Sequence, residues 1–412
     1  MSEIASTTRL PRRSLSTRLR RLGFDPWLLL LVVCLLAFGL VMVYSASWDV
    51  SYRMYQDPSA LLFRQMGNLA LGLIAMLVAS RIPLHWLRRF ALPIIVFAIV
   101  ALVAVLLVGG GDEPRRSFMG GSIQPSELAK LALIIYLAVW MESKEDRVAD
   151  WGYGFWPLMV IVGLVGGLVL QQPDLSAAIT IGVVALMMFI LAGARFIQTL
   201  LIMVGSATVG YLLVRVNRTG IQRWGDFVAG LVDIEKASYH VQSSLQAFYT
   251  GGLLGRGLGA SRGKFGLLPA PHTDSIFAIV GEELGLAGAL LTLALFALFL
   301  WRGFRIASKA NGKLAMLLAS GISFWIGLEA FVNMSVLLGL LPFAGNALPF
   351  ISFGGSSLMT TLTGVGLLLN VSRRAPVEGR IGGEVAAVDI GGWDGGRRVS
   401  RPSRRRRTRK KR

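Results

Sequence analysis

The sequence contains few of the residues that soluble proteins use for charge, cross-linking and metal binding. Only 16% of its 412 residues are charged, whereas a soluble domain carries about 25%, so an ordinary soluble domain is excluded. Cys34 is the single cysteine, which excludes a disulfide within the chain. With three histidines in all, no His and Asp cluster specifies a metal site, and the sequence leaves the metal unknown.

Apolar residues, in contrast, are abundant and occur in long runs. Hydrophobic residues make up 54% of the chain, and runs such as 27–45 have the roughly 20 apolar residues that a spanning helix needs. Hydropathy predicts ten spans, at 27–47, 61–80, 90–108, 126–143, 155–171, 175–193, 196–214, 277–301, 313–340 and 355–371. The sequence therefore predicts an all-α polytopic membrane protein with a large extracytoplasmic loop between helices 7 and 8.

Basic residues indicate the orientation of these helices. Ten spans place both termini on one side, and the connections on that side carry basic residues such as Arg88, Arg89, Lys144 and Arg147. By the positive-inside rule this side is cytoplasmic. The first apolar run follows about 26 residues and is too long for a cleavable signal peptide.

Two basic tails flank the predicted membrane domain. Residues 1–26 form a basic N-terminal tail, 27–372 the transmembrane domain, and 373–412 a basic tail that is predicted to be disordered. Because both tails adjoin spanning helices, anionic lipids of the cytoplasmic leaflet are the expected partner. Nucleic acid is the disfavoured alternative.

A polar connection of about 60 residues, 215–276, separates the seventh and eighth predicted spans on the outer side. Unstructured loops of this length are uncommon unless they are functional. Within it, 238–255 has an amphipathic pattern, which is typical of a helix that lies in the membrane interface or re-enters the membrane.

Ionisable residues within spans are candidates for a functional site, because such charges are costly and usually face a protein-lined cavity. Glu127 and Lys130 are three residues apart at the start of the fourth span, so they share a face and can pair. The pair could join helices, or its cation could contact an anionic lipid headgroup. Asp174 could cap the sixth span, or pair with Lys130 or an arginine of the outer loop.

Further polar residues occur in the last three spans. Glu329 and Asn333 are one turn apart, and a buried glutamate needs a cation partner or a proton. Of Glu282 and Glu283 near the start of the eighth span, we expect one to face the bundle. The Gly-, Pro- and Ser-rich segment 341–358 could line a polar cavity, or could simply turn between two helices.

Asp274 stands where the outer loop enters the eighth predicted span, directly after His272 and Thr273. A carboxylate at such a boundary between water and membrane can serve as a proton acceptor near neutral pH. The alternative is a loop aspartate that begins the helix as its N-cap. Residue types alone favour the cap, since caps greatly outnumber catalytic bases.

Six ordered segments are GLVMVYSAS (39–47), QPSELAK (124–130), QPDL (172–175), GGLLGRGLGAS (251–261), HTD followed by IFAIVGEELG (272–285), and LPFISFGGSSL (348–358). Together they resemble the SEDS family (shape, elongation, division and sporulation) of FtsW- and RodA-like peptidoglycan polymerases. The resemblance extends over 26–372. Two of the segments, the first and IVGEELG, favour the FtsW type, which acts in division rather than elongation.

The resemblance implies a glycosyltransferase that polymerises lipid II, an undecaprenyl-pyrophosphate-linked disaccharide pentapeptide, at the outer face of the bacterial cytoplasmic membrane. Asp274 would be the general base on the acceptor sugar's 4-hydroxyl. Glu127, Lys130 and Asp174 match positions that the family needs for activity. The other residues expected to contact or support the substrate are Arg223, Gln242, Arg256, Arg262, Lys264, His272, Ser356 and Ser357.

The leaving pyrophosphate needs cations, which Lys130 and the basic residues of the outer loop can supply, and a divalent cation, Mg or Mn, could share this task. The resemblance also implies a class B penicillin-binding protein, a transpeptidase, as partner, with other divisome or elongasome membrane proteins. A lipid II flippase and a scaffold that recruits the transpeptidase are the alternatives. The outer position of most intramembrane charges favours the polymerase.

Several residues depart from the family pattern. Ala270 and Glu329 replace a glutamate and a glutamine, Ser275 and Phe353 replace an aromatic residue and a tyrosine, and Ser176 stands where glycine is common. The segment GDEPRRSFMGGS (111–122) lacks the tryptophan that usually precedes QPSE. These differences leave Asp274 in place but alter the surroundings in which a substrate would bind.

Overall fold

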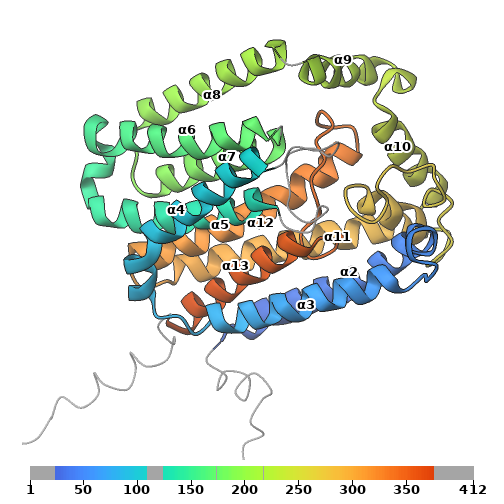
Figure 1. Cartoon of the computed structure of the whole chain (residues 1–412), viewed down its shortest axis with the longest axis horizontal. Coiled ribbons are helices and arrows are strands. Elements are labelled where there is room, and N and C mark those ends of the chain that lie inside the picture. The colour runs from blue at the N-terminus through green and yellow to red at the C-terminus, as the bar shows by residue number, and fades with distance from the viewer. Residues whose placement is uncertain (1–23, 109–123, 173, 217, 375–412) are drawn as a thin grey trace, which may run out of the picture. The chain divides into compact units, whose positions relative to one another are not determined.

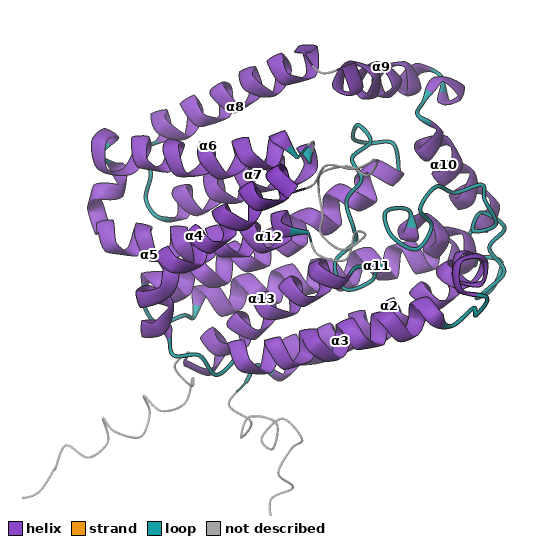
Figure 2. Cartoon of the chain, viewed as in Figure 1, coloured by secondary structure: helices purple, strands orange, loops and turns teal. Residues whose placement is uncertain are grey.

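The computed structural model describes residues 24–108, 124–172, 174–216 and 218–374, and within these ranges the chain forms helices and no strands (Figure 1; Figure 2). The all-α prediction is confirmed for this part of the chain. The two basic tails fall almost entirely outside the described residues, as does the segment 111–122.

Each of the ten predicted spans coincides with a helix. In chain order these are α2 (Pro26–Tyr55), α3 (Ala60–Ala79), α4 (Leu84–Val108), α5 (Pro125–Lys144), α6 (Trp156–Gln171), α7 (Leu175–Leu191), α8 (Phe196–Val216), α11 (Ile276–Ser308), α12 (Lys313–Leu337) and α13 (Gly355–Arg374). Within the described ranges, six helices are long and apolar enough to cross a membrane, and α7 and most of α8 form shorter apolar helices. The chain is a multi-pass membrane protein, while the number of crossings stays a prediction.

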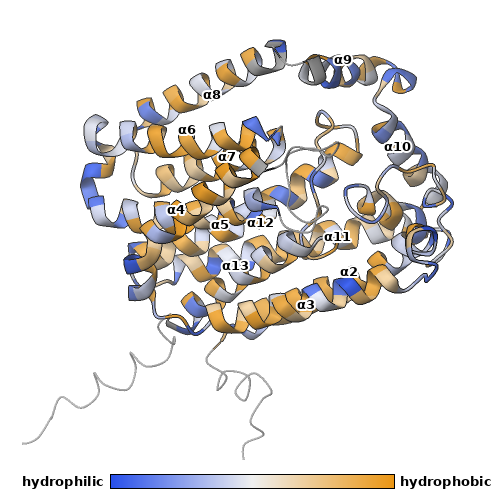
Figure 3. Cartoon of the chain, in the orientation of Figure 1, coloured by the Kyte–Doolittle hydropathy of each residue, from blue (hydrophilic) through white to orange (hydrophobic). Residues whose placement is uncertain are grey.

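Packing explains why α5 and α13 are less apolar than the six. α5 contacts α4, α7, α12 and α13, and most of its residues are buried. α13 contacts α3, α5, α11 and α12. A helix enclosed by other helices needs no apolar surface toward lipid, and polar side chains can join it to its neighbours. Figure 3 shows hydrophobic residues dominating α2, α3, α4 and α6.

Both ends of the described chain lie at the same end of the helices. Asp25 caps α2, and its N–H donates to Ser372 Oγ near the end of α13 (3.2 Å). The Asp25 carboxylate also pairs with Arg302 of α11 (2.6 Å). An even number of crossings requires this arrangement. That this end is cytoplasmic remains a prediction from the positive-inside rule.

The long connection 215–276 contains two further helices, α9 (Arg218–Val232) and α10 (Tyr239–Gly251). α10 packs against α11, where Gly251 allows its main chain to approach that of α11 and Gly281 leaves room for the ring of Phe248. The amphipathic pattern of 238–255 thus corresponds to a helix whose buried face lies on α11.

α11 is broken near its start at Gly285, whose φ of 66° is left-handed. The loop after α10 enters this break: Arg256 N donates to Glu282 O (3.0 Å), and Leu286 N donates to Gly252 O (2.9 Å). The loop thereby satisfies backbone groups that the broken helix leaves without partners. The sequence predicted an unbroken span here, because glycine is compatible with both conformations.

Gly39 of α2 allows this helix to pack closely against the segment 341–358. A Cβ atom on Gly39 would lie 2.9 Å from Ile351 Cα, so even alanine requires the main chain to move. A Cβ atom on Gly67 of α3, in contrast, would meet open space.

We predict that Gly39→Ala destabilises the protein by about 1–3 kcal/mol, the usual cost of overpacking. Gly67→Ala should leave stability unchanged or slightly raised, because alanine favours a helix. Thermal unfolding of the two detergent-solubilised variants, followed as loss of monodisperse protein, measures the difference. Equal stability of the two variants would contradict this account of the packing.

Candidate functional site around Asp274

Asp274 lies on the turn that precedes α11 (Figure 1), at the opposite end of this helix from Arg302, which pairs with Asp25. The N-cap of α11 is Ser275, whose hydroxyl donates to Pro269 O (2.7 Å). The interpretation of Asp274 as the N-cap is therefore wrong. Serine and aspartate are both good caps, so the sequence could not separate two adjacent candidates. Ala270, left-handed at φ 45°, closes the turn by accepting hydrogen bonds from Thr273 N and Ser275 N.

The glycine-rich segment 341–358 packs against this turn. Ser352 and Phe353 donate hydrogen bonds to the two carbonyl oxygens before Asp274, at 2.6 and 2.8 Å. Gly345 lies directly against the carboxylate, since a Cβ atom on Gly345 would be 2.7 Å from Asp274 Oδ2. This segment turns between α12 and α13 and also packs against Asp274, while a polar cavity along it stays a prediction.

His272 lies on the same turn and is partly buried, with its ring edge-on to Phe353 at 5.6 Å between centroids. Burial lowers the pKa of His272 below its ordinary value, which favours the neutral imidazole. A neutral imidazole can both donate and accept a hydrogen bond.

Lys130 is buried between two carboxylates. Its ammonium pairs with Glu127 of the same helix (2.8 Å) and with Glu329 of α12, and it stands 5.7 Å from the ring centroid of Trp325. The predicted pair is confirmed, and the cation that Glu329 needs is Lys130. Since two carboxylates surround one ammonium, the geometry favours joining of helices over binding of an anionic headgroup.

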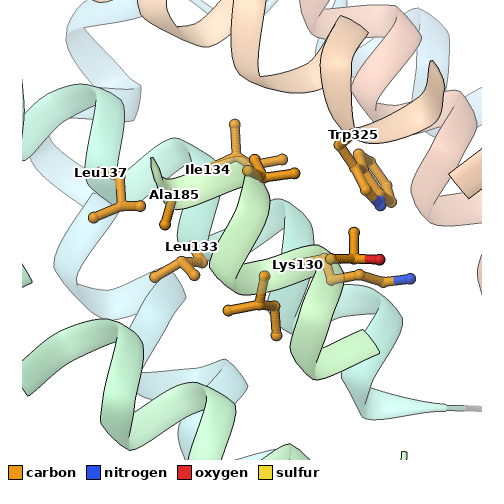
Figure 4. Close-up of a pocket in the computed structure, with 9 residues that line it drawn as sticks. Lys130, Leu133, Ile134, Leu137, Ala185 and Trp325 are labelled. Atoms are coloured by element: carbon orange, nitrogen blue, oxygen red, sulfur yellow. The ribbon is translucent and has the colours of Figure 1, made fainter. Parts of the chain in front are cut away.

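Lys130 also borders a small cavity of about 10 Å³ between α5, α7 and α12 (Figure 4). Figure 4 shows the Lys130 ammonium directed away from Leu133 and Ile134, which belong to the aliphatic lining. The space holds about one water molecule. It is too small for a lipid chain or a sugar, so this cavity is not a candidate substrate site.

Asp174 is the N-cap of α7, accepting from Ala177 N (3.1 Å), so the predicted capping role is confirmed. Its carboxylate also accepts hydrogen bonds from Gln124 Nε2 (2.8 Å) and Ser126 Oγ (3.2 Å). The alternative that Asp174 pairs with Lys130 is not supported, because Lys130 pairs with Glu127 and Glu329, and a pairing with an arginine of the long loop stays a prediction. Gln124 and Ser126 reach the Asp174 carboxylate because α5 begins beside the start of α7.

Two serines of α13 were also predicted to support the substrate. Ser356 Oγ accepts a hydrogen bond from Gln124 N (3.1 Å), which joins the first turns of α13 and α5. Ser357 is half-buried in the same first turn. The beginnings of α5, α7 and α13 therefore meet in one polar region.

α12 links the Lys130 cluster to the Asp274 turn. Glu329 and Asn333 are four residues apart and so lie on one face of the helix. Glu329 reaches Lys130, and the Asn333 amide donates to Asp274 O (3.0 Å). The sequence signals this contact only through the presence of a polar residue, Asn333, within an apolar span.

A second buried cluster fastens the long loop 215–276 to α11. Glu283 accepts a hydrogen bond from Ser45 Oγ of α2 (2.6 Å) and pairs with Lys264 (3.3 Å), whose side chain is 4% exposed. Both Glu282 and Glu283 are buried, so the expectation that one of them faces the bundle is confirmed, and the second is buried as well. The broken helix lets the loop cover two adjacent residues.

The Glu282 side chain holds the loop mainly by binding main-chain N–H groups of the loop. Its carboxylate accepts hydrogen bonds from Ser261 Oγ (2.5 Å), Arg262 N (3.0 Å) and Gly263 N (3.1 Å). Arg256 lies 3.5 Å from the same carboxylate and is partly exposed. Arg262 is also exposed, so both arginines are accessible to a ligand.

Arg223 and Gln242 occupy the helices of the outer segment. The Arg223 guanidinium stands 5.8 Å from the ring centroid of Phe343, and His240 stacks on the same ring at 4.0 Å. Burial, then the charge of Arg223, lowers the pKa of His240. Gln242 Nε2 donates to two main-chain carbonyls just before α10, both at 2.7 Å. These contacts connect α9 and α10 to the glycine-rich segment.

These features define a class of protein: a multi-pass helical membrane protein with a carboxylate on a restrained turn at one end and buried ion pairs beneath it. The family model for the FtsW, RodA and SpoVE cell cycle proteins matches residues 26–376. The chain belongs to this family.

Individual relatives agree with this membership. A protein of Geobacter metallireducens named probable peptidoglycan glycosyltransferase FtsW is 40% identical over 356 residues, which cover 85% of this chain and 95% of the relative. Stage V sporulation protein E of Bacillus subtilis is 38% identical over 357 residues, which cover 85% and 97%. Both therefore match over nearly their whole length.

Solved structures share the fold. A chain of a peptidoglycan synthase complex, described as coordinating polymerization and crosslinking, is 29% identical with a TM-score of 0.69, covering 85% of this chain and 98% of that one. The rod shape determining protein RodA of Thermus thermophilus is 28% identical with a TM-score of 0.62, covering 87% and 100%.

The charge count around Lys130 leads to a prediction. Lys130→Met leaves two buried carboxylates without a cation and should destabilise the protein by about 3–5 kcal/mol. Glu329→Gln keeps the Lys130–Glu127 pair and should be tolerated. Thermal unfolding and the yield of monodisperse protein compare the two. A Lys130→Met protein as stable as Glu329→Gln would show that the cation does not hold the helices.

Proposed function

We propose that this chain is a peptidoglycan glycosyltransferase that polymerises lipid II into glycan strands at the outer face of the bacterial cytoplasmic membrane during cell division. The observation that carries the proposal is the place of Asp274, whose carboxylate lies against Gly345 on a turn held by the glycine-rich segment. Relatives named as probable peptidoglycan glycosyltransferases support the same activity.

In the proposed reaction Asp274 is the general base. Its carboxylate takes the proton of the acceptor sugar's 4-hydroxyl, and the oxygen attacks the anomeric carbon of the donor. The bond from this carbon to undecaprenyl pyrophosphate breaks, and the pyrophosphate leaves with the electron pair. A base confined between a restrained turn and a wall is held in one reactive position, which is a large part of what catalysis requires.

The leaving pyrophosphate needs cationic contacts. We assign this role to Arg262, which is exposed. We assign it also to Arg256, whose side chain is partly exposed and lies 3.5 Å from Glu282. Lys130 and Lys264 are matched by buried carboxylates. In our proposal they hold helices and loop in place so that the arginines can meet the substrate.

We further propose that a divalent cation, Mg or Mn, enters with the pyrophosphate, whose oxygens are suitable ligands. Among the residues that the structure describes, no three His, Cys, Asp or Glu side chains form a metal-binding group. The donor set therefore fits an ion carried by the substrate better than one resident in the protein.

A class B penicillin-binding protein is the proposed partner, because a polymerised glycan must next be crosslinked by a transpeptidase. Other division membrane proteins would join the assembly. We also propose that both termini are cytoplasmic, where the basic tails would meet anionic lipids. The Asp274 end then faces outward, where lipid II and the growing glycan meet.

Asp274→Asn is predicted to lower the rate of lipid II polymerisation by about 100-fold or more, because the amide cannot accept the proton. Asp233→Asn in the same outer segment is the matched control, since Asp233 caps a short turn and pairs with Lys236 at the surface. Gel analysis of glycan strands, with and without the transpeptidase and a divalent cation, measures both rates.

An unchanged polymer yield from folded Asp274→Asn protein would overturn the proposed activity. Headgroup-labelled lipid II in proteoliposomes provides a second readout. Transport of the label without polymer formation would identify a flippase instead.

A further inference from the structure

The main chain of the Asp274 turn is held by donors that are distant in the sequence. Three consecutive carbonyl oxygens accept hydrogen bonds: His272 O from Phe353 N (2.8 Å), Thr273 O from Ser352 Oγ (2.6 Å) and Asp274 O from Asn333 Nδ2 (3.0 Å). Two donors belong to the glycine-rich segment and one to α12. Tertiary contacts therefore place this turn.

Asn333, which is 2% exposed, makes the contact nearest to the carboxylate. Its Nδ2 also donates to Asn346 O, and Asn346 Nδ2 donates to Glu329 O (3.1 Å). Because two carbonyl oxygens meet the same atom of the Asn333 amide, that atom is the nitrogen. One amide thus joins the turn, α12 and the glycine-rich segment.

Holding this carbonyl restrains the main chain from which the Asp274 carboxylate projects. On the other side Gly345 stands so close that a Cβ atom there would be 2.7 Å from Oδ2. The carboxylate is thus confined between the main chain that Asn333 holds and the wall that Gly345 forms. Misplacing a catalytic group by about 1 Å can slow a reaction about 100-fold.

We propose that Asn333 is a positioning residue, which acts through the main chain of Asp274 to set where the general base stands. The inference rests on the proposed function for its catalytic consequence. The contact itself is a feature of the fold and can be tested without any substrate.

Asn333→Ala removes the donor while leaving every proposed substrate contact in place. The rate at saturating lipid II should fall about 10- to 100-fold, and KM should change by no more than about twofold. Ser335→Ala, buried on α12 two residues later, is the matched control and should keep the wild-type rate. Hydrogen exchange of 270–277 should become faster in Asn333→Ala and not in Ser335→Ala.

Gly345→Ala moves the same carboxylate from the other side without altering Asn333, and it keeps the inference testable if Asn333→Ala fails to fold. It should also lower the saturated rate and leave KM near its wild-type value. Gly182→Ala in α7 is the control for this pair, because a Cβ atom on Gly182 meets open space.

Wild-type rate and wild-type exchange in Asn333→Ala would overturn the inference, as would a loss of rate that comes wholly from a raised KM. Activity of Asp274→Asn would overturn the proposed function instead. Faster exchange in Asn333→Ala would then still establish that the amide holds the turn. The two failures are therefore distinguishable.

Discussion

Charged side chains inside a membrane must be paired, and this constraint organises the centre of the molecule. Lys130 is 3% exposed and is held by one carboxylate of α5 and one of α12. Separating these groups would leave uncompensated buried charges, which costs several kcal/mol. α5 and α12 are thus fixed relative to each other. Because Asn333 lies one turn from Glu329, the same constraint reaches the Asp274 turn.

The loop before Asp274 is also restrained by buried charges, in this case those of α11. Glu282 and Glu283 bind the loop that precedes Asp274, although they follow Asp274 in the sequence. Residues about ten positions before Asp274 are therefore bound to residues about ten positions after it. The segment that contains Asp274 is therefore held at both of its ends, which limits the motion of a stretch that would otherwise be part of a long polar loop.

The features that depend on local sequence were predictable. Hydropathy located ten helices, because spanning length is set by bilayer thickness, and the spacing of Glu127 and Lys130 indicated their pairing. The attachment of Lys130 to Glu329 was not predictable, because it joins residues 199 positions apart. The break at Gly285 and the burial of Lys264 depend on how the loop enters α11. Periodicity contains no information on such contacts.

The same division between local and distant contacts explains how the turn accommodates unusual side chains. Ala270 and Ser275 depart from the family pattern, yet each acts through groups that many residues possess: Ala270 through its carbonyl, and Ser275 through its N–H and a short hydroxyl contact with Pro269. An alanine at φ 45° is mildly strained, and two hydrogen bonds to its carbonyl offset that strain. The turn is shaped mainly by donors from α12 and the glycine-rich segment, so its own side chains can vary while Asp274 keeps its place.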